Sequence, residues 1–297
     1  MNTKKLNGLI KSSRPKTLLV GIAPVILGSA YSYSKHPTDF SILIFLITLA
    51  CTILLQAGTN IVNEYFDFKT GVDTIERLGP KRSLLTGILK PSDLKIFFYT
   101  CFILSFILGI FLMIEGGIVI SIIGISAIII AYCYTGGPIP LSHFYLGEFL
   151  AFLFFGPVAV LGTAILQKSS VGTDLILLSC IPGFISAALM SLNNLRDINT
   201  DQMTNKKTLA IFWGENNSRF FTILLGLSPI ILCLIFEWEN WIVKVISLLP
   251  PILFIPLWKL ILKNKELTSL NSGIAQFGKY NVLYCLLLSI LCFLQLK

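Results

Sequence analysis

Charged residues are scarce in this sequence. Asp, Glu, Lys and Arg make up 13% of its 297 residues, whereas 55% are hydrophobic. Soluble globular domains carry about 25% charged residues, so the composition excludes an ordinary soluble protein and favours an integral membrane protein. The formal net charge is +8, but the basic residues are spread between apolar runs. They form no concentrated basic face, and we expect no nucleic-acid partner.

Histidine is rare, and the cysteines are not paired. The chain has two histidines, and its seven cysteines lie mostly inside apolar runs with no C-x-x-C pair. We therefore expect no His/Cys metal cluster and interpret the cysteines as small apolar packing residues. The N-terminus is basic, but no small-residue cleavage pattern follows it. We expect a retained first helix instead of a signal peptide.

Long apolar runs are abundant. A bilayer core about 30 Å thick requires roughly 20 predominantly apolar residues per helix. Nine such runs are present: 17–34, 41–61, 94–114, 117–135, 147–167, 174–193, 219–236, 241–262 and 279–296. The sequence predicts a single all-α membrane domain over residues 1–297 with nine transmembrane helices.

The basic residues alternate between the two sides of these runs. Nineteen of the 23 Lys and Arg residues lie before the first run or in and beside the second, sixth and eighth connections. Cytoplasmic loops carry such an excess, so we place these segments in the cytoplasm. With an odd number of spans, the C-terminus is then external. We expect a multi-pass protein of the cell (inner) membrane.

The second run ends in a row of polar side chains. Spacings of four, three and four residues place them on one helical face: Gln56, Asn60, Asn63 and Asp67. Polar groups at this depth are costly in lipid and usually face a cavity or a partner. Gly71 allows the backbone to turn, so Asp73, which is off this face in a straight helix, is expected to return to the same site.

The pattern recurs 130 residues later. The stretch SLNNLRDINTD places Asn193, Asp197 and Asp201 at intervals of four, again on one helical face at the cytoplasmic end of a run. An offset of four helices preserves orientation, which predicts two parallel pseudo-repeats about an axis along the membrane normal. The two motifs are then expected to face each other.

The residue types of both motifs suit a magnesium site. Carboxylate and amide oxygens are hard ligands, and Mg²⁺ typically takes one or two carboxylates together with substrate phosphates. Basic residues accompany both motifs, including Lys81, Arg82, Arg196 and Lys206. This combination favours a diphosphate bound through Mg²⁺ over two solvated helix ends.

At these residues the chain resembles the UbiA family of intramembrane prenyltransferases, whose hallmark is two Asp-rich motifs. Here the motifs read NEYFD at 63–67 with Asp73, and NNLRDINTD at 193–201. The resemblance covers nearly the whole chain and implies nine helices around a central cavity. The stretches RPKTL at 14–18 and YTGGPIPLSHFYLGE at 134–148 resemble the family branch that prenylates 1,4-dihydroxy-2-naphthoate.

The resemblance implies a polyprenyl diphosphate donor, a 1,4-dihydroxy-2-naphthoate acceptor, Mg²⁺ as cofactor and membrane lipid around the protein. The acceptor would lose carbon dioxide, giving demethylmenaquinol in menaquinone biosynthesis. The implied metal ligands are Asn63, Asp67, Asp73, Asn193, Asp197 and Asp201, and Asp67 and Asp197 are also expected to be catalytic. The implied substrate-binding residues are Arg14, Asn60, Lys81, Arg82 and Lys206. Tyr134 and Glu148 are expected to contact the acceptor, with Glu148 as a candidate proton acceptor.

The sequence leaves two alternatives open. The first is prenyl transfer to another aromatic acceptor, such as 4-hydroxybenzoate or homogentisate. The second is a secondary transporter, because parallel repeats and polar residues within the membrane also occur in that class. A transporter is expected to show broken helices at matching positions in both halves, and its polar residues are expected near the midplane instead of at one face.

Overall fold

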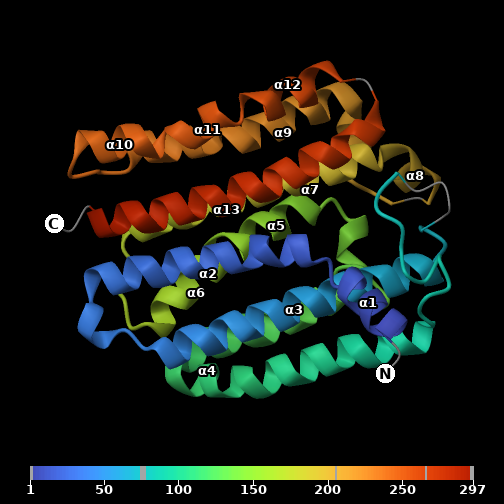
Figure 1. The fold of residues 1–297 in the computed structure, drawn as a ribbon, viewed down its shortest axis with the longest axis horizontal. Coiled ribbons are helices and arrows are strands. Elements are labelled where there is room, and N and C mark those ends of the chain that lie inside the picture. The colour runs from blue at the N-terminus through green and yellow to red at the C-terminus, as the bar shows by residue number, and fades with distance from the viewer. Residues whose placement is uncertain (1–2, 74–77, 205, 265, 295–297) are drawn as a thin grey trace.

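The computed structural model describes residues 3–73, 78–204, 206–264 and 266–294, and every regular element within them is helical (Figure 1). The α-helices are α1 (Thr3–Ser12), α2 (Pro15–Lys35), α3 (Ile42–Lys69), α4 (Pro91–Cys133), α5 (Gly147–Phe155), α6 (Pro157–Leu166), α7 (Thr173–Arg196), α8 (Ile198–Met203), α9 (Leu209–Ile235), α10 (Trp241–Ser247), α11 (Leu249–Leu253), α12 (Ile255–Lys263) and α13 (Leu270–Leu294). Three short 3-10 helices, η1 (Pro37–Asp39), η2 (Leu141–His143) and η3 (Leu267–Ser269), lie in connections.

Helix α4 contains two membrane-crossing arms. Among the described residues, eight helical segments are long and apolar enough to span a bilayer, and α4 is counted once among them. Its 43 residues bend at Gly117, where φ is 66° and ψ is −154°. The rings of Phe98 and Tyr132 lie 6.3 Å apart, whereas a straight helix would separate them by about 50 Å. The two arms therefore run antiparallel and account for the expected runs 94–114 and 117–135.

Two helix starts differ from the apolar runs. Helix α13 begins at Leu270, nine residues before the run predicted at 279–296. Helix α9 begins at Leu209, ten residues before the run predicted at 219–236, but its backbone breaks at Gly214, where φ is 76° and ψ is 172°. The residues before the two runs include polar and charged ones such as Glu215, Asn271 and Gln276, so a criterion based on apolar runs misses them. The predicted run at 241–262 forms three short helices, with breaks at Leu248 and Phe254, shortly before Pro250 and Pro256, because proline lacks the amide donor of a continuous helix.

The packing of the helices repeats along the chain. Helix α3 packs against α2 and α4, and α7 packs against α5 and α9 in the same relation four spans later. This is the arrangement predicted for parallel pseudo-repeats. Helix α7 is central, with 67% of its most apolar stretch buried, against 11% for α4. The exposed face of α4 is rich in isoleucine, as expected for contact with lipid.

Helices α3 and α7 finish at the same end of the bundle, called the motif end here, beside α1 and α8 (Figure 1). The connection after α3 is held there by buried polar contacts. Ser12 of α1 donates to the Ser83 hydroxyl at 3.0 Å. The buried Glu64 Oε1 accepts a hydrogen bond from the Leu84 amide at 3.1 Å. A short amphipathic helix and a buried carboxylate therefore position the segment that carries Arg82.

Candidate functional site

Arg82 joins the two aspartates of the first acidic motif, Asp67 and Asp73. Helix α3 ends at Lys69, and Gly71 adopts φ 75°, a left-handed conformation that favours glycine. The Asp73 amide then donates to the Asp67 carbonyl at 3.0 Å, which returns Asp73 to the end of the helix as the sequence predicts. Arg82 Nε lies 2.9 Å from Asp73 Oδ2, and Arg82 Nη2 lies 3.4 Å from Asp67 Oδ2.

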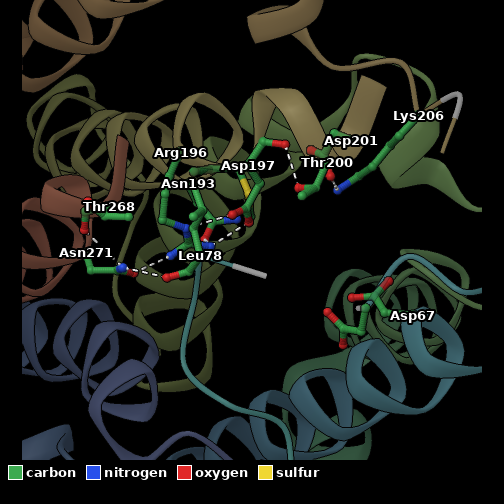
Figure 2. Close-up of polar contacts among 12 residues, drawn as sticks. Asp67, Leu78, Asn193, Arg196, Asp197, Thr200, Asp201, Lys206, Thr268 and Asn271 are labelled. Atoms are coloured by element: carbon green, nitrogen blue, oxygen red, sulfur yellow. Dashed lines mark hydrogen bonds and ion pairs between the residues drawn. The ribbon is translucent and has the colours of Figure 1, made fainter. Parts of the chain in front are cut away.

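In the second acidic motif, Arg196 bonds to the side chains of Asn193 and Asp197 (Figure 2). Arg196 Nε donates to Asp197 Oδ1 at 2.8 Å, and Nη2 donates to Asp197 Oδ2 at 2.5 Å and to Asn193 Oδ1 at 2.8 Å. Arg196 Nη1 donates to Asn271 Oδ1 of α13 at 3.0 Å. Both predicted metal ligands at the end of α7 therefore share one guanidinium group.

Asp201 lies one turn further on, in α8. Lys206 Nζ lies 3.3 Å from Asp201 Oδ1 and 3.2 Å from Oδ2. Burial is the main reason that the pKa of Asp201 lies above its ordinary value; Lys206 opposes this shift, and the charge of Asp197 adds to it. Lys206 therefore stabilises a carboxylate that is otherwise costly to ionise at this position.

The two motifs act on each other electrostatically. Burial lowers the pKa of Arg82 from its ordinary value, and the negative charges of Asp67 and Asp197 act in the opposite direction. Figure 2 shows Asp67 at the end of α3, lying across from Asp201 and Lys206. The helical spacing seen in the sequence therefore brings both motifs to one end of the bundle, each within the electrostatic reach of the other.

A second polar group lies beside the motifs, where α4 leads into α5. Glu148 is buried, and its Oε1 accepts a hydrogen bond from Asn194 Nδ2 at 3.0 Å. The Tyr134 hydroxyl lies 3.4 Å from the Met190 sulfur. A side chain at Gly147 would come within 3.2 Å of the Tyr134 hydroxyl, so a glycine permits this close approach. The structure thus gathers Tyr134 and Glu148 next to α7.

The remaining predicted site residues have different surroundings. Thr135 donates to Asn63 Oδ1 at 2.5 Å. Asn60 is buried and donates to the Ser13 carbonyl at 2.8 Å, so in this structure its amide holds the junction of α1 and α2. The structure places Arg14 half-buried at the start of α2, and Lys81 is exposed.

Sequence reasoning missed three residues that contribute to this site, Thr135, Asn194 and Asn271. It also named Arg196 only as a neighbouring cation and did not predict its pairing with Asn193 and Asp197. Thr135 lies inside the YTGGP string, and Asn194 inside NNLRD, so both strings offered a signal. Asn271 had none, because it belongs to the last helix and reaches the motif only through the fold.

The donor atoms fit a magnesium ion bound jointly with a diphosphate. Both motifs offer carboxylate and amide oxygens, which are the hard ligands that Mg²⁺ takes. In the part of the chain that the structure describes, no three His, Cys, Asp or Glu side chains are close enough to hold a metal by themselves. Phosphate oxygens would complete the ligand set, as is usual for Mg²⁺.

Fold and site together define an all-helical membrane protein with two oxygen-rich motifs at one end of its bundle. The sequence profile of the UbiA prenyltransferase family matches residues 17–294. The chain belongs to the UbiA prenyltransferase family.

Relatives and solved structures agree with this assignment. The chain is 34% identical over 255 residues to 1,4-dihydroxy-2-naphthoate octaprenyltransferase of Haemophilus influenzae, covering 82% of each chain. It is 31% identical over 234 residues to the Escherichia coli protein of the same name, covering 77% of this chain and 75% of that protein. The solved structure of a UbiA homolog from Archaeoglobus fulgidus bound to DMAPP and Mg²⁺ has a TM-score of 0.68 at 15% identity, covers 94% of this chain and 99% of that one, and shares the fold.

Proposed function

We propose that the protein transfers a polyprenyl group from polyprenyl diphosphate to 1,4-dihydroxy-2-naphthoate, giving demethylmenaquinol in menaquinone biosynthesis. The observation that carries this proposal is the pair of acidic motifs, each joined to a cation, at one end of a UbiA-type bundle. The relatives named 1,4-dihydroxy-2-naphthoate octaprenyltransferase support the choice of acceptor.

The proposed reaction balances without an external oxidant or reductant. The bond between the allylic carbon and the diphosphate oxygen breaks, and diphosphate leaves with the electron pair. The ring carbon that bears the carboxylate forms the new carbon–carbon bond. Loss of carbon dioxide returns an electron pair to the ring, so no proton has to leave that ring carbon.

The acidic motifs would hold the donor through Mg²⁺. The proposed ligands are Asn63, Asp67, Asp73, Asn193, Asp197 and Asp201. When bound, Mg²⁺ would supply Lewis-acid neutralisation of the charge that develops on the leaving diphosphate. Arg82 and Lys206 would bind the diphosphate directly, because charge-assisted hydrogen bonds to phosphate are among the stronger ones, with Lys81 and Arg14 as further cations.

Glu148 has the surroundings expected of a group that accepts a proton from the acceptor. Its Oε1 is engaged by Asn194, but its buried Oε2 has no hydrogen-bond partner among the described residues. A buried oxygen without a partner is costly, and a hydroxyl group of the naphthoate ring would satisfy it. Proton transfer to Glu148 would make the ring a better nucleophile, and the proton would return to the ring oxygen after carbon dioxide has left, so that demethylmenaquinol keeps both hydroxyl groups. Tyr134 would contact the ring.

The acceptor assignment and the metal requirement can be tested in one assay. Purified protein is supplied with Mg²⁺, a labelled polyprenyl diphosphate and, in turn, 1,4-dihydroxy-2-naphthoate, 4-hydroxybenzoate and homogentisate. We expect product with the naphthoate and loss of activity in excess chelator, restored by Mg²⁺ or Mn²⁺. Faster prenylation of either other acceptor would contradict the substrate, and full turnover in chelator would contradict the metal role.

We also propose that the motif end faces the cytoplasm of a cell with an inner membrane. The excess of Lys and Arg in the connections at this end supports that orientation. It places the N-terminus inside and, with nine crossing segments, the C-terminus outside. Reporter fusions at the C-terminus should then give an external signal, and a cytoplasmic signal would mean that the spans are miscounted.

The transporter alternative lacks the feature that it requires. Among the described residues, the structure contains broken helices at Gly156 between α5 and α6, at Gly214 in α9, and in the series α10 to α12. These breaks lie in the fifth, seventh and eighth crossing segments, no two of which are four apart, whereas the repeats are offset by four. They are therefore not matched between the halves, and the acidic motifs lie at one end of the bundle instead of at its midplane.

A further inference from the structure

The guanidinium group of Arg196 occupies the oxygen atoms of the second motif. Its nitrogen atoms bond to both carboxylate oxygens of Asp197 and to the amide oxygen of Asn193 (Figure 2). Arg196 is 3% exposed and Asp197 is 9% exposed, so this is a buried ion pair and not a surface contact. A metal ion that uses Asn193 and Asp197 must compete with Arg196 for the same oxygen atoms.

Asn271 gives Arg196 an uncharged partner that does not depend on the motif. Asn271 Nδ2 donates to the Leu78 carbonyl at 2.7 Å and to the Thr268 carbonyl at 3.1 Å. These two bonds fix the amide so that Oδ1 faces Arg196 Nη1 at 3.0 Å. Asn271 can therefore keep hold of the guanidinium group while its bonds to Asp197 are replaced.

A metal ion that binds without diphosphate would leave the positive charges of this site uncompensated. The Arg82 and Lys206 side chains are joined to Asp67, Asp73 and Asp201 in the same way. A metal ion that takes the carboxylates leaves buried cations without their counter-ions, which is costly. A diphosphate brings negative charge for the displaced cations and oxygen ligands for the metal at the same time.

We propose that Arg196 is a resident counter-ion of the second motif that makes metal and diphosphate bind as one unit. The metal takes the oxygen atoms of Asn193 and Asp197, and Arg196, retained by Asn271, binds the diphosphate instead. This inference rests on the proposed function and adds to it the coupling between metal binding and diphosphate binding. By linkage, each ligand must raise the affinity for the other by the same factor.

Equilibrium dialysis of the full chain in detergent tests the coupling, with Mn²⁺ as the metal probe and inorganic diphosphate as the anion. Metal bound on the protein side is measured with and without diphosphate. We expect diphosphate to lower the Kd of wild type for Mn²⁺ about tenfold or more. Arg196→Gln, which removes the competing charge, should bind Mn²⁺ alone about tenfold more tightly than wild type and lose most of the effect of diphosphate.

Arg219→Gln is the matched control. Arg219 is also a buried arginine, paired with Glu215 at 2.7 Å and bonded to the Ile261 carbonyl at 2.5 Å, but it belongs to α9. This variant should bind Mn²⁺ like wild type. If Arg196→Gln does not fold, Asn271→Ala is measured in its place. In this variant the effect of diphosphate on the Kd for Mn²⁺ should be smaller than in wild type, because Arg196 loses its bond to Asn271.

The inference is overturned if Arg196→Gln binds Mn²⁺ alone no more tightly than wild type, or if Asn271→Ala keeps the full coupling. The proposed function has its own readout, which is prenylated naphthoate. A protein that forms this product without the coupling contradicts only the role of Arg196. A protein that shows the coupling but prenylates no naphthoate contradicts only the proposed acceptor.

Discussion

The two acidic motifs have similar sequences, but different local structures build them. In the first, α3 ends, the backbone reverses at Gly71, and the cation Arg82 comes from the following connection. In the second, the chain passes from α7 into α8 at Asp197, and the cation is the adjacent Arg196. The first motif therefore depends on a connection that must be held in place, whereas packed helices carry the second.

The supports of the motifs differ accordingly. The connection of the first motif is held by Glu64 and by the contact of Ser12 with Ser83. The second motif is held by Asn271 of the last helix, which also bonds to Leu78 of that connection. Asn271 thus joins the connection of the first motif to the packed helices of the second. Substitutions in the two motifs should therefore act through different supports even though both motifs serve one site.

Replacing the central carboxylates tests whether the motifs form one site, and we expect the largest effect here. Asp67→Asn and Asp197→Asn each keep the size of the side chain and one oxygen but remove the charge that binds a hard dication. Loss of about 4 kcal/mol of metal-mediated stabilisation would slow turnover by roughly a thousandfold in each variant. The double variant should be hardly slower than the slower single one, because residues that act as a unit are strongly non-additive.

The measurement for this cycle is the rate of demethylmenaquinol formation at matched protein level. Thermal unfolding of each variant serves as the control for folding. Multiplication of the single losses, to about a millionfold in the double variant, would mean two independent sites and would contradict the facing-motif arrangement.

Arg82→Ala should separate donor binding from acceptor binding. Arg82 bonds to Asp67 and Asp73 and is proposed to bind the diphosphate. A hydrogen bond to a charged group contributes about 1.5–3 kcal/mol, so donor affinity should fall roughly ten- to hundredfold while acceptor affinity is nearly unchanged. Arg82→Lys, which keeps the charge, should recover part of the loss. A fall in acceptor affinity without a fall in donor affinity would contradict this proposal, because it would show that the connection carrying Arg82 binds the acceptor and not the donor.

Gly71→Ala tests the dependence of the first motif on its backbone turn. Left-handed backbone costs a residue with a Cβ roughly 1–2 kcal/mol. Gly87 is the matched control, because its φ of 69° is close to the 75° of Gly71 and neither has an atom within 4 Å of an added Cβ. Both variants should lose similar thermal stability, but only Gly71→Ala should weaken donor binding, by displacing Asp73. Equal donor affinities in the two variants would remove Asp73 from the site.

The fold could be predicted largely from local patterns. Apolar runs located the spans, and the Gly71 turn brought Asp73 back to Asp67 as expected, because both signals are contained in neighbouring residues. The central cavity that the resemblance implies remains a prediction. The starts of α9 and α13 were missed because their first turns lie outside the apolar runs.

The contacts of the second motif could not be predicted in the same way. In a continuous helix, adjacent side chains point about 100° apart, so Arg196 and Asp197 are not expected to pair. Helix α7 ends at Arg196, and Asp197 has φ −92° and ψ 10°, which allows the two side chains to meet. Asn271 lies 75 residues from Arg196 in sequence, and no spacing rule relates them.

The smallest expected effect is a change in the pKa of His143, which tests whether the two motifs share one site. This residue interacts electrostatically with one charged group of each motif, Lys206 and Asp67. Burial lowers the pKa of His143 from its ordinary value; the cation Lys206 lowers it further, and the carboxylate of Asp67 raises it. Lys206→Gln should therefore raise the His143 pKa, and Asp67→Asn should lower it. With His36→Gln as background, His143 is the one histidine left in the 297 residues, so the NMR titration of labelled histidine in chelator reports it alone.

The same shift fixes the direction of a stability change with pH. A base whose pKa is depressed in the folded state contributes stability that is fully present above its unfolded pKa, about 6.5, and is lost as the pH falls through the folded value. Thermal stability of the His36→Gln protein should decline over that acidic range, and less steeply after Lys206→Gln. If both substitutions moved the His143 pKa in the same direction, His143 would not lie between opposite charges, and the two motifs would not share one electrostatic site.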